Sequence, residues 1–180
     1  MSELKLTDGA KGRSPMAGWY WPLAAAVLIY VVASALILRA NPDAEIRFRI
    51  DVAPLLAAET ALKIHVGSAI GAFFLGLAIM LAPKGVGLHK QMGWTWVALM
   101  AATAISSFWL TGLAGGGFSP IHGLSAWVVI GLPMGLAAIR RRNVKAHSRH
   151  MTGMFMGAMA IAGLFTFLPG RLMWSLFFGA

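Results

Sequence analysis

The 180-residue sequence is strongly apolar and basic: 58% of its residues are hydrophobic, 12% are charged, and the formal net charge is +9. A soluble domain needs more polar surface than this, and the absence of cysteine excludes disulfides, thiolate metal sites and covalent c-type haem attachment. Long unbroken apolar runs favour membrane-spanning helices over a barrel, whose strands would alternate. We therefore expect a single all-α polytopic membrane domain over residues 1–180.

A bilayer-spanning helix needs about 20 apolar residues, and about five segments meet that length. They are residues 18–39, 62–82, 91–113, 120–139 and 151–178. The first span follows a short tail (residues 1–17), begins with Trp19, Tyr20 and Trp21, and ends at Arg39, as a helix anchored at both interfaces should. It lacks a convincing small-residue cleavage site, so we interpret it as a retained anchor rather than a removed signal peptide.

Positive charges predict the orientation of these helices, because Lys and Arg near helix ends stay on the cytoplasmic side. They gather before the first span, between the second and third, and between the fourth and fifth: Lys5, Lys11, Arg13, Lys84, Lys90, Arg140, Arg141, Arg142, Lys145 and Arg149. The loop at residues 114–120 carries no charge, which suits the opposite side. We expect a cytoplasmic tail, an external loop at residues 40–61 and a C-terminus outside the cytoplasm. The net charge is then a topology signal, since no solvated basic domain for nucleic acid is present.

The predicted external loop contains a stretch from Glu45 to Val52 in which polar and apolar residues alternate. Such a stretch could lie extended on the outer surface of the bundle. Pro54 is typical of the first turn of a helix that Asp51 caps. The alternative is an interfacial linker with no further role.

No Asp or Glu occurs from Thr60 to Ala180. This absence excludes paired-carboxylate catalysis, a carboxylate proton relay and an oxygen-rich calcium or magnesium site from that region. Histidine remains as the group that titrates near neutrality and binds soft metals, with methionine as a weaker ligand. The five histidines all fall there, in two levels: His65 and His122 near the outer face, and His89, His147 and His150 near the cytoplasmic face.

The same region repeats weakly, because residues 65–69 (HVGSA) are echoed by residues 122–126 (HGLSA). A further histidine follows 24 residues after His65 and 25 residues after His122. Two similar helical hairpins predict that the second to fifth spans pack as a four-helix bundle, with one histidine pair at each membrane face.

Facing histidine pairs beside small residues suit a planar macrocycle, which needs two neutral imidazoles along its axis. We therefore hypothesise that His65 pairs with His122, and His89 with His147 or alternatively His150, each pair binding the iron of a haem b. The protein would then carry electrons across the membrane between membrane or peripheral redox partners. The cations available to haem propionates on the outer side are Arg47, Arg49, Lys63 and Arg171.

Plainer explanations stand beside this one. Small residues at helical spacing also let membrane helices pack closely without any ligand, and each histidine taken alone favours an interfacial or interhelical hydrogen-bonding role. The competing hypothesis is a non-enzymatic membrane protein, namely an assembly partner, small-molecule carrier or regulator whose histidines are structural or pH-responsive. Pro133 and the Pro169-Gly170 pair would permit kinks or a gate in such a protein.

Three segments carry a resemblance to a known family: residues 118–125 (FSPIHGLS), residues 140–147 and residues 163–171 (GLFTFLPGR). They resemble the bacterial membrane protein family catalogued as domain of unknown function 2306, from about the first helix to the C-terminus. The resemblance implies a polytopic protein of the bacterial inner membrane and supplies no assigned activity. The four-histidine layout is also similar in arrangement to diheme b-type cytochromes, without a shared motif.

The family pattern bears on the choice between His147 and His150. It has a basic residue directly after the histidine in both cytoplasmic loops; Lys90 fits this pattern after His89, whereas Ser148 follows His147. The family pattern favours His147 as the ligand. The helical face argument favours His150 instead, because small residues lie on the same face of the helix as His150. We retain His147 as the expected ligand, with His150 as the alternative.

Overall fold

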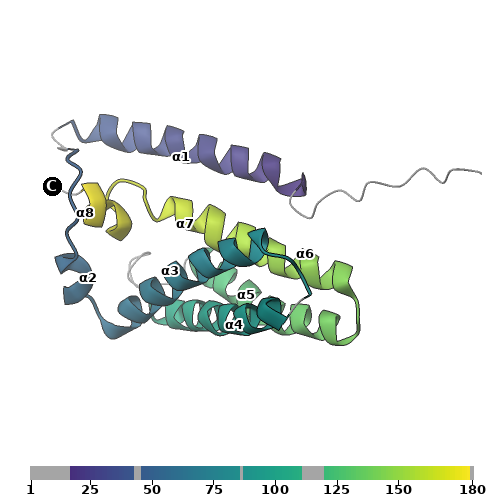
Figure 1. Ribbon diagram of the computed structural model, residues 1–180. Helices are drawn as coiled ribbons and strands as arrows, with labels where there is room; N and C mark the ends of the chain where they lie inside the picture. Colours follow the sequence, from purple (N-terminus) through teal and green to yellow (C-terminus); the bar gives the residue numbers. More distant parts are fainter. Residues whose placement is uncertain (1–16, 43–45, 86, 111–119, 179–180) are drawn as a thin grey trace, which may run out of the picture.

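The computed structural model describes residues 17–42, 46–85, 87–110 and 120–178. Every regular element within these residues is a helix (Figure 1). The longer helices are α1 (Tyr20–Ala40), α3 (Thr60–Leu81), α4 (Gly87–Ser106), α5 (Pro120–Arg140) and α6 (Val144–Met154). The shorter ones are α2 (Ala53–Ala57), α7 (Ala162–Phe165), α8 (Leu172–Phe178) and two single 3-10 turns, Ala17–Trp19 and Ser107–Trp109. The expected all-α class is confirmed for this part of the chain.

Three of the described helices are long and apolar enough to cross a membrane: α1, α3 and α5. Helix α4 is also 20 residues long, but its first two turns contain His89, Lys90 and Gln91, which lower its hydropathy. The last predicted span is divided among several elements. A total of about five spans therefore stays a prediction.

Residues 144–165 form one uninterrupted helix whose middle is π-helical. Helix α6 leads into the π-helical segment Phe155–Ile161, which leads into α7. The structure corrects the expected fifth element, residues 151–178, because this helix begins at Val144 and ends at Phe165. Pro169 and Gly170, whose φ is +83°, turn the chain before α8 begins as a separate helix.

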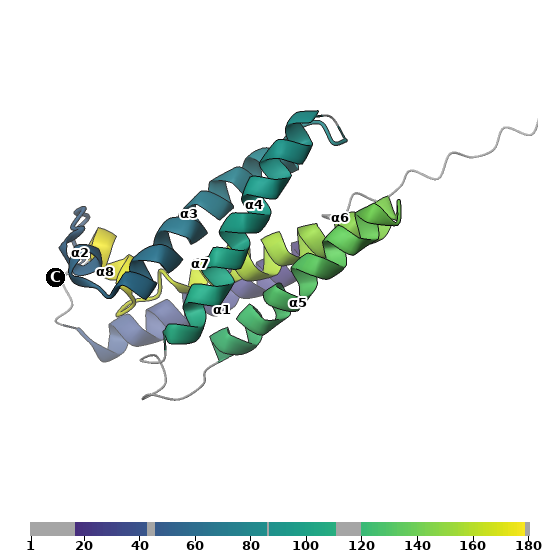
Figure 2. The same cartoon turned by 90° about the horizontal axis from the view of Figure 1, so that it is seen from below.

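Two antiparallel hairpins, α3–α4 and α5–α6, pack against each other through α4 and α5 (Figure 2). The π-helical segment also contacts α3. The core between the hairpins is built mostly from alanine, methionine and aromatic side chains. Its buried members are Ala72, Trp96, Met100, Ala104, Val128, Leu132, Met154, Phe155, Met156 and Met159.

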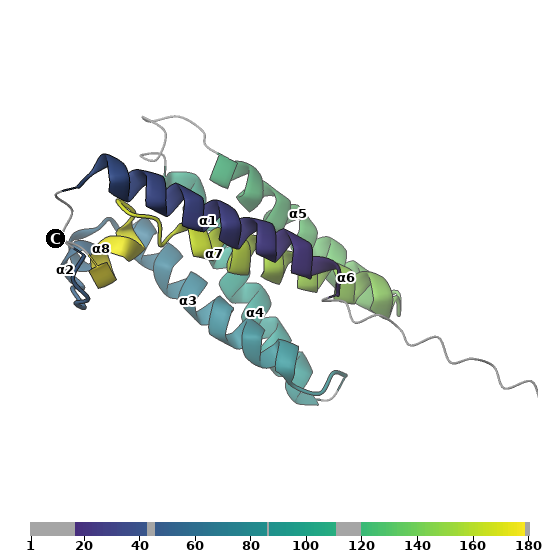
Figure 3. The same ribbon diagram turned by 90° about the horizontal axis from the view of Figure 1, so that it is seen from above.

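Helix α1 lies across the outside of α6 and α7 and is largely exposed (Figure 3). Only Ala26 of its residues is buried. Near one end of α1 the Trp19 ring lies beside Gly153 and Gly157, and farther along the Tyr30 hydroxyl donates a hydrogen bond to the Phe167 carbonyl oxygen at 3.1 Å. An apolar exposed helix of this kind suits contact with lipid.

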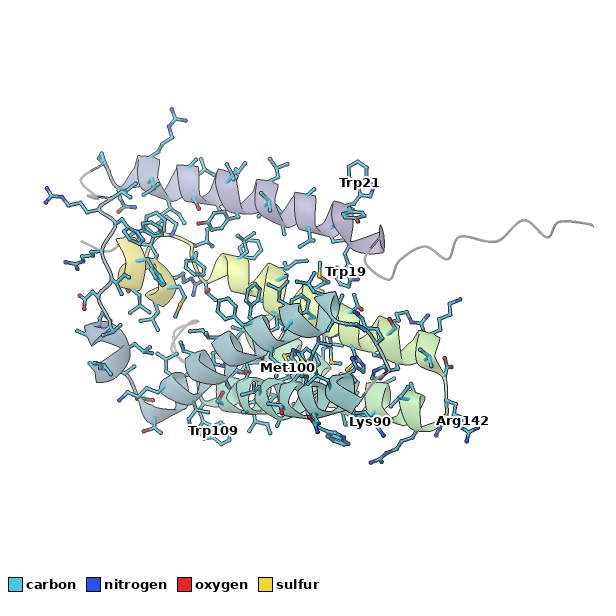
Figure 4. The ribbon with its side chains drawn as sticks, viewed as in Figure 1. Trp19, Trp21, Lys90, Met100, Trp109 and Arg142 are labelled. Atoms are coloured by element: carbon cyan, nitrogen blue, oxygen red, sulfur yellow. The ribbon has the colours of Figure 1, made fainter. Side chains whose placement is uncertain are left out.

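The two ends of the molecule differ in charge and structure. Lys90 and Arg142 lie at the end that contains the α3–α4 and α5–α6 connections, and Trp109 lies toward the opposite end (Figure 4). At that opposite end the extended residues 46–52 run beside α8, where the backbone N–H groups of Arg49 and Asp51 donate to the carbonyls of Phe177 and Leu176 at 2.9 Å each. We call these the basic end and the α8 end.

Candidate functional site: a cavity beside His65

The half of the molecule nearer the α8 end contains a cavity of about 620 Å³. Its walls come from α3, α4, α5, the π-helical segment with α7, and α8. The lining is mainly apolar, with four phenylalanines and three methionines: Phe73, Phe74, Phe167, Phe177, Met100, Met159 and Met173. Its polar contributors are His65, Thr103, Ser125 and Thr166. This volume and composition are typical of small-molecule sites in proteins.

The imidazole of His65 is oriented by a backbone carbonyl. Its Nδ1 atom lies 2.9 Å from the carbonyl oxygen of Thr103, which belongs to the last turn of α4, where carbonyls lack a full set of helical donors. A carbonyl oxygen can only accept, so Nδ1 carries the hydrogen and donates it. In the neutral ring Nε2 then holds a lone pair, which is the state that binds metals or accepts hydrogen bonds.

Buried hydroxyl groups connect the three helices around this histidine. The Thr103 hydroxyl lies 2.9 Å from the Ser68 hydroxyl, which joins α4 to α3. The hydroxyls of Ser107 and Ser125 lie within hydrogen-bonding distance, which joins the end of α4 to α5. Hydrogen bonds between membrane helices position the helices on which they lie. The cavity therefore has a polar part within about two turns of the ends of these helices.

His122, the predicted partner of His65, is 4% exposed and lies near the start of α5. Its ring centroid is 6.2 Å from that of Phe108. His65 and His122 thus lie toward the same end of the molecule, but His65 lines the cavity and His122 is not among the lining residues. Their pairing on one haem iron stays a prediction.

The structure brings His89 close to His147 at the basic end. His147 follows the start of α6, which the Asn143 side chain caps by accepting from the Ala146 N–H at 3.0 Å. Its Nδ1 lies 3.0 Å from the carbonyl oxygen of Gly135 on α5. Burial lowers the pKa of His89, and the nearby positive charges of His147 and Lys84 lower it further. The Cβ of His150 instead lies against Gly135.

The cavity could not be predicted from the sequence. The repeated HVGSA and HGLSA segments drew attention to His65 and Ser125, but Thr103, Met159 and Phe177 carried no signal of their own. Among the described residues, no group of three or more histidine, aspartate and glutamate side chains is placed to hold a metal ion. A haem iron held by a histidine pair needs only two side chains, so that finding does not test haem ligation.

Comparison with known proteins identifies one family. A model of the family described as predicted membrane protein, DUF2306, matches residues 62–178, from α3 to α8. No curated protein and no solved structure matches the chain. Since the matched part contains the cavity, both hairpins and most of the sequence, the chain belongs to the DUF2306 family of predicted membrane proteins.

Proposed function

We propose that this protein binds a lipid-soluble small molecule within the membrane, in the cavity beside His65. The observation that carries the proposal is the cavity of about 620 Å³ whose lining is apolar except for His65, Thr103, Ser125 and Thr166. Apolar walls favour an apolar ligand by burying its surface, and a few polar groups fix its orientation. Ionisable and polar groups inside a membrane protein are uncommon and mark functional sites by default.

The π-helical segment supports the same proposal. Ala158, Met159 and Ala160 lie in Phe155–Ile161 and line the cavity. Short π-helical segments inside α-helices occur frequently at functional sites. Here the segment widens the helix beside the cavity and sets the small side chains of Ala158 and Ala160, on either side of Met159, in part of its wall.

Charge supports an orientation for the protein in a bacterial inner membrane, with the basic end in the cytoplasm. No acidic residue occurs from Thr60 onward. In that region the basic end has seven cations: Lys84, Lys90, Arg140, Arg141, Arg142, Lys145 and Arg149. The C-terminus would then lie outside the cytoplasm, and the cavity would lie in the outer leaflet. A phosphatase fused after Ala180 should be active, and a cytoplasmic reporter at that position should be inactive. The reverse result would overturn this orientation.

The binding proposal is tested by filling the cavity. The protein would be purified in nanodiscs, and bound molecules would be extracted and identified by mass spectrometry. Ala69→Phe places a ring in the cavity wall and should remove most of the co-purifying ligand, whereas Ala78→Phe, on an exposed position of the same helix, should leave it in place. Equal ligand content in wild type and both variants would refute the proposal.

A second candidate function, electron transport by haem b, is favoured by the geometry of His65. The bond from Nδ1 to the Thr103 carbonyl is the kind of partner that metal-binding histidines have, and it leaves Nε2 for an iron. His122 remains the predicted second ligand, and the thioethers of Met100, Met159 and Met173 are other soft groups in the cavity. Bound haem would supply one-electron chemistry; the chain's own part would be to hold and bury it.

This candidate is tested by the spectrum of the purified protein. A reduced-minus-oxidised difference spectrum of the b type is expected if haem is the ligand. His65→Asn and His122→Asn should then abolish the same haem, whereas His89→Asn and His147→Asn should affect a different one. A colourless protein that takes up no added haem would refute haem binding and leave the broader proposal in place.

A further inference from the structure

We infer that the ligand of the cavity carries an aromatic hydroxyl group, as a lipid-soluble hydroquinone or phenol does, and that it donates this hydroxyl to Nε2 of His65. The inference rests on the proposed function and names the chemical class of its ligand. It involves binding alone, and no electron transfer is part of it.

The first step concerns what His65 can offer. Nδ1 donates to the Thr103 carbonyl oxygen at 2.9 Å, and the Ser106 hydroxyl oxygen lies 3.4 Å from the same nitrogen. Among the described residues, hydrogen-bond partners of this ring are found at Nδ1 alone. In the neutral imidazole, Nε2 is therefore an acceptor without a protein donor, on a residue that lines the cavity. A ligand hydroxyl satisfies it, whereas a ketone or ether oxygen does not.

The second step concerns the rest of the ligand head. Four phenylalanines and three methionines line the cavity, and aromatic and thioether side chains both favour contact with an aromatic ring. The hydroxyls of Thr103 and Ser125 already lie close to other oxygen acceptors, at 2.8 Å from the Leu99 carbonyl and 2.9 Å from the Ile121 carbonyl. They therefore have little left to donate, and His65 is the group that discriminates between ligands.

The third step concerns the route by which such a ligand enters. Ile70, Phe73 and Phe74 line the cavity and are 49%, 37% and 65% exposed, on a helix that is apolar enough to span the membrane. The cavity wall at these residues thus meets the hydrocarbon region, where the tail of a lipid-soluble ligand resides. The ligand reaches the site from the bilayer, with its hydroxyl inward at His65 and its tail outward past Phe74.

The experiment compares matched probes in nanodiscs that contain the full chain. 4-Heptylphenol and 4-heptylanisole differ only in whether the oxygen bears a hydrogen. Calorimetric titration should show about tenfold tighter binding of the phenol, since the anisole buries Nε2 without giving it a donor. Decylubiquinol should likewise bind more tightly than decylubiquinone under anaerobic conditions.

Variants assign the preference to one atom. His65→Phe keeps a ring of similar size but removes the acceptor at Nε2, while the Thr103 carbonyl still accepts from the Ser106 hydroxyl, so the phenol-to-anisole ratio should fall to about one. Ala78→Phe, which places the same side chain at an exposed position of the same helix, should leave the ratio unchanged. Equal binding of phenol and anisole by the wild type, a preference that persists in His65→Phe, or equally tight binding of 1-undecanol would each overturn the inference.

Failure of the inference can be told apart from failure of the proposed function. If both probes bind equally and Ala69→Phe abolishes binding of both, the cavity binds lipid-soluble molecules but the ligand class is wrong. If Ala69→Phe leaves the binding of both probes unchanged, the cavity is not the binding site, and both proposals are overturned.

Discussion

Small residues serve different purposes in the two halves of the molecule. In the half nearer the α8 end, alanines and glycines lie beside open volume, and the cavity results. In the half nearer the basic end, glycines lie directly under large side chains: Gly76 under Trp96 and Phe155, Gly131 under Met154, and Gly135 under Met151. The same small residue types therefore make space for a ligand in one half and bring helices into contact in the other.

Small residues alone therefore do not mark a ligand site in a membrane protein. The two halves differ in the side chain that lies opposite each small residue. Beside Gly76 and Gly135 a long or aromatic side chain of the facing helix fills the space, whereas Ala69 and Ala162 line the open cavity. Interiors of proteins are normally close-packed, so a cavity of this volume is a candidate for function.

The largest expected effect on stability comes from placing the same larger side chain once beside the cavity and once in the packed core. Ala69 lines the cavity and Ala72, about one turn along α3, is fully buried in the core. Ala72→Leu should lower the free energy of unfolding by about 3 kcal/mol, because overpacking a filled core forces its neighbours to move. Ala69→Leu should change it by less than about 1 kcal/mol. Thermal or denaturant unfolding in detergent checks both, and equal losses would contradict the distinction between the halves.

A smaller effect is expected where a glycine accommodates aromatic rings. A Cβ at Gly76 would lie 2.6 Å from a Phe155 ring atom and 2.7 Å from Nε1 of Trp96. Gly76→Ala should therefore destabilise the protein by about 2 kcal/mol. Gly67, on the same helix, has no such neighbour within 4 Å, so Gly67→Ala should be neutral or slightly stabilising. If Gly76→Ala is as stable as Gly67→Ala, the helices are less tightly packed than the structure indicates.

A still smaller effect is expected from the hydroxyl contacts beside the cavity. Thr103→Val removes the bond to Ser68 but keeps the side-chain volume and the carbonyl that orients His65. A double-mutant cycle with Ser68→Ala should give a coupling of about 0.6 kcal/mol, the average for interhelical hydrogen bonds in a membrane protein. Phenol binding should be retained in Thr103→Val. Its loss would show that the hydroxyl, and not the carbonyl, prepares His65.

Features of the fold that depend on one segment could be predicted from the sequence, whereas features that depend on contacts between segments could not. The hydropathy of α1, α3 and α5 is a local property, and these helices were expected within a few residues of their observed bounds. The division of the last span was not expected, because the apolar run continues through Leu172–Phe178 and conceals the turn that Pro169 and Gly170 make.

The candidate site was predicted in part. His65 stood out because it lies near the start of an apolar segment without carboxylates. Its actual partner, the Thr103 carbonyl, could not be foreseen, because a backbone atom leaves no mark in the sequence and the contact depends on how α3 and α4 pack. The cavity depends on five segments at once.

The smallest expected effect is a pH dependence at the basic end. The pKa of His89 in the folded protein lies below its ordinary value of about 6.5, because of burial and then of the charges on His147 and Lys84. The folded form therefore binds fewer protons than the unfolded form, so stability is full above about pH 6.5 and falls as pH drops through the lowered pKa. His89→Gln should flatten this decline in melting temperature. Lys84→Gln, which removes one repulsive charge, should weaken it, and a decline unchanged in both variants would contradict the assignment.

The π-helical segment has a consequence for how this family can change. A π-helical turn contains about one residue more than an α-helical turn, so Phe155–Ile161 acts as a stored insertion within residues 144–165. Deleting one residue there would restore α-helical periodicity and rotate everything after it by about 100° around the helix axis. Gly163, Phe167 and Phe177 would then leave the cavity wall together. The loss of a single codon would thus convert a chain with this site into one whose last helices turn a different face toward the cavity.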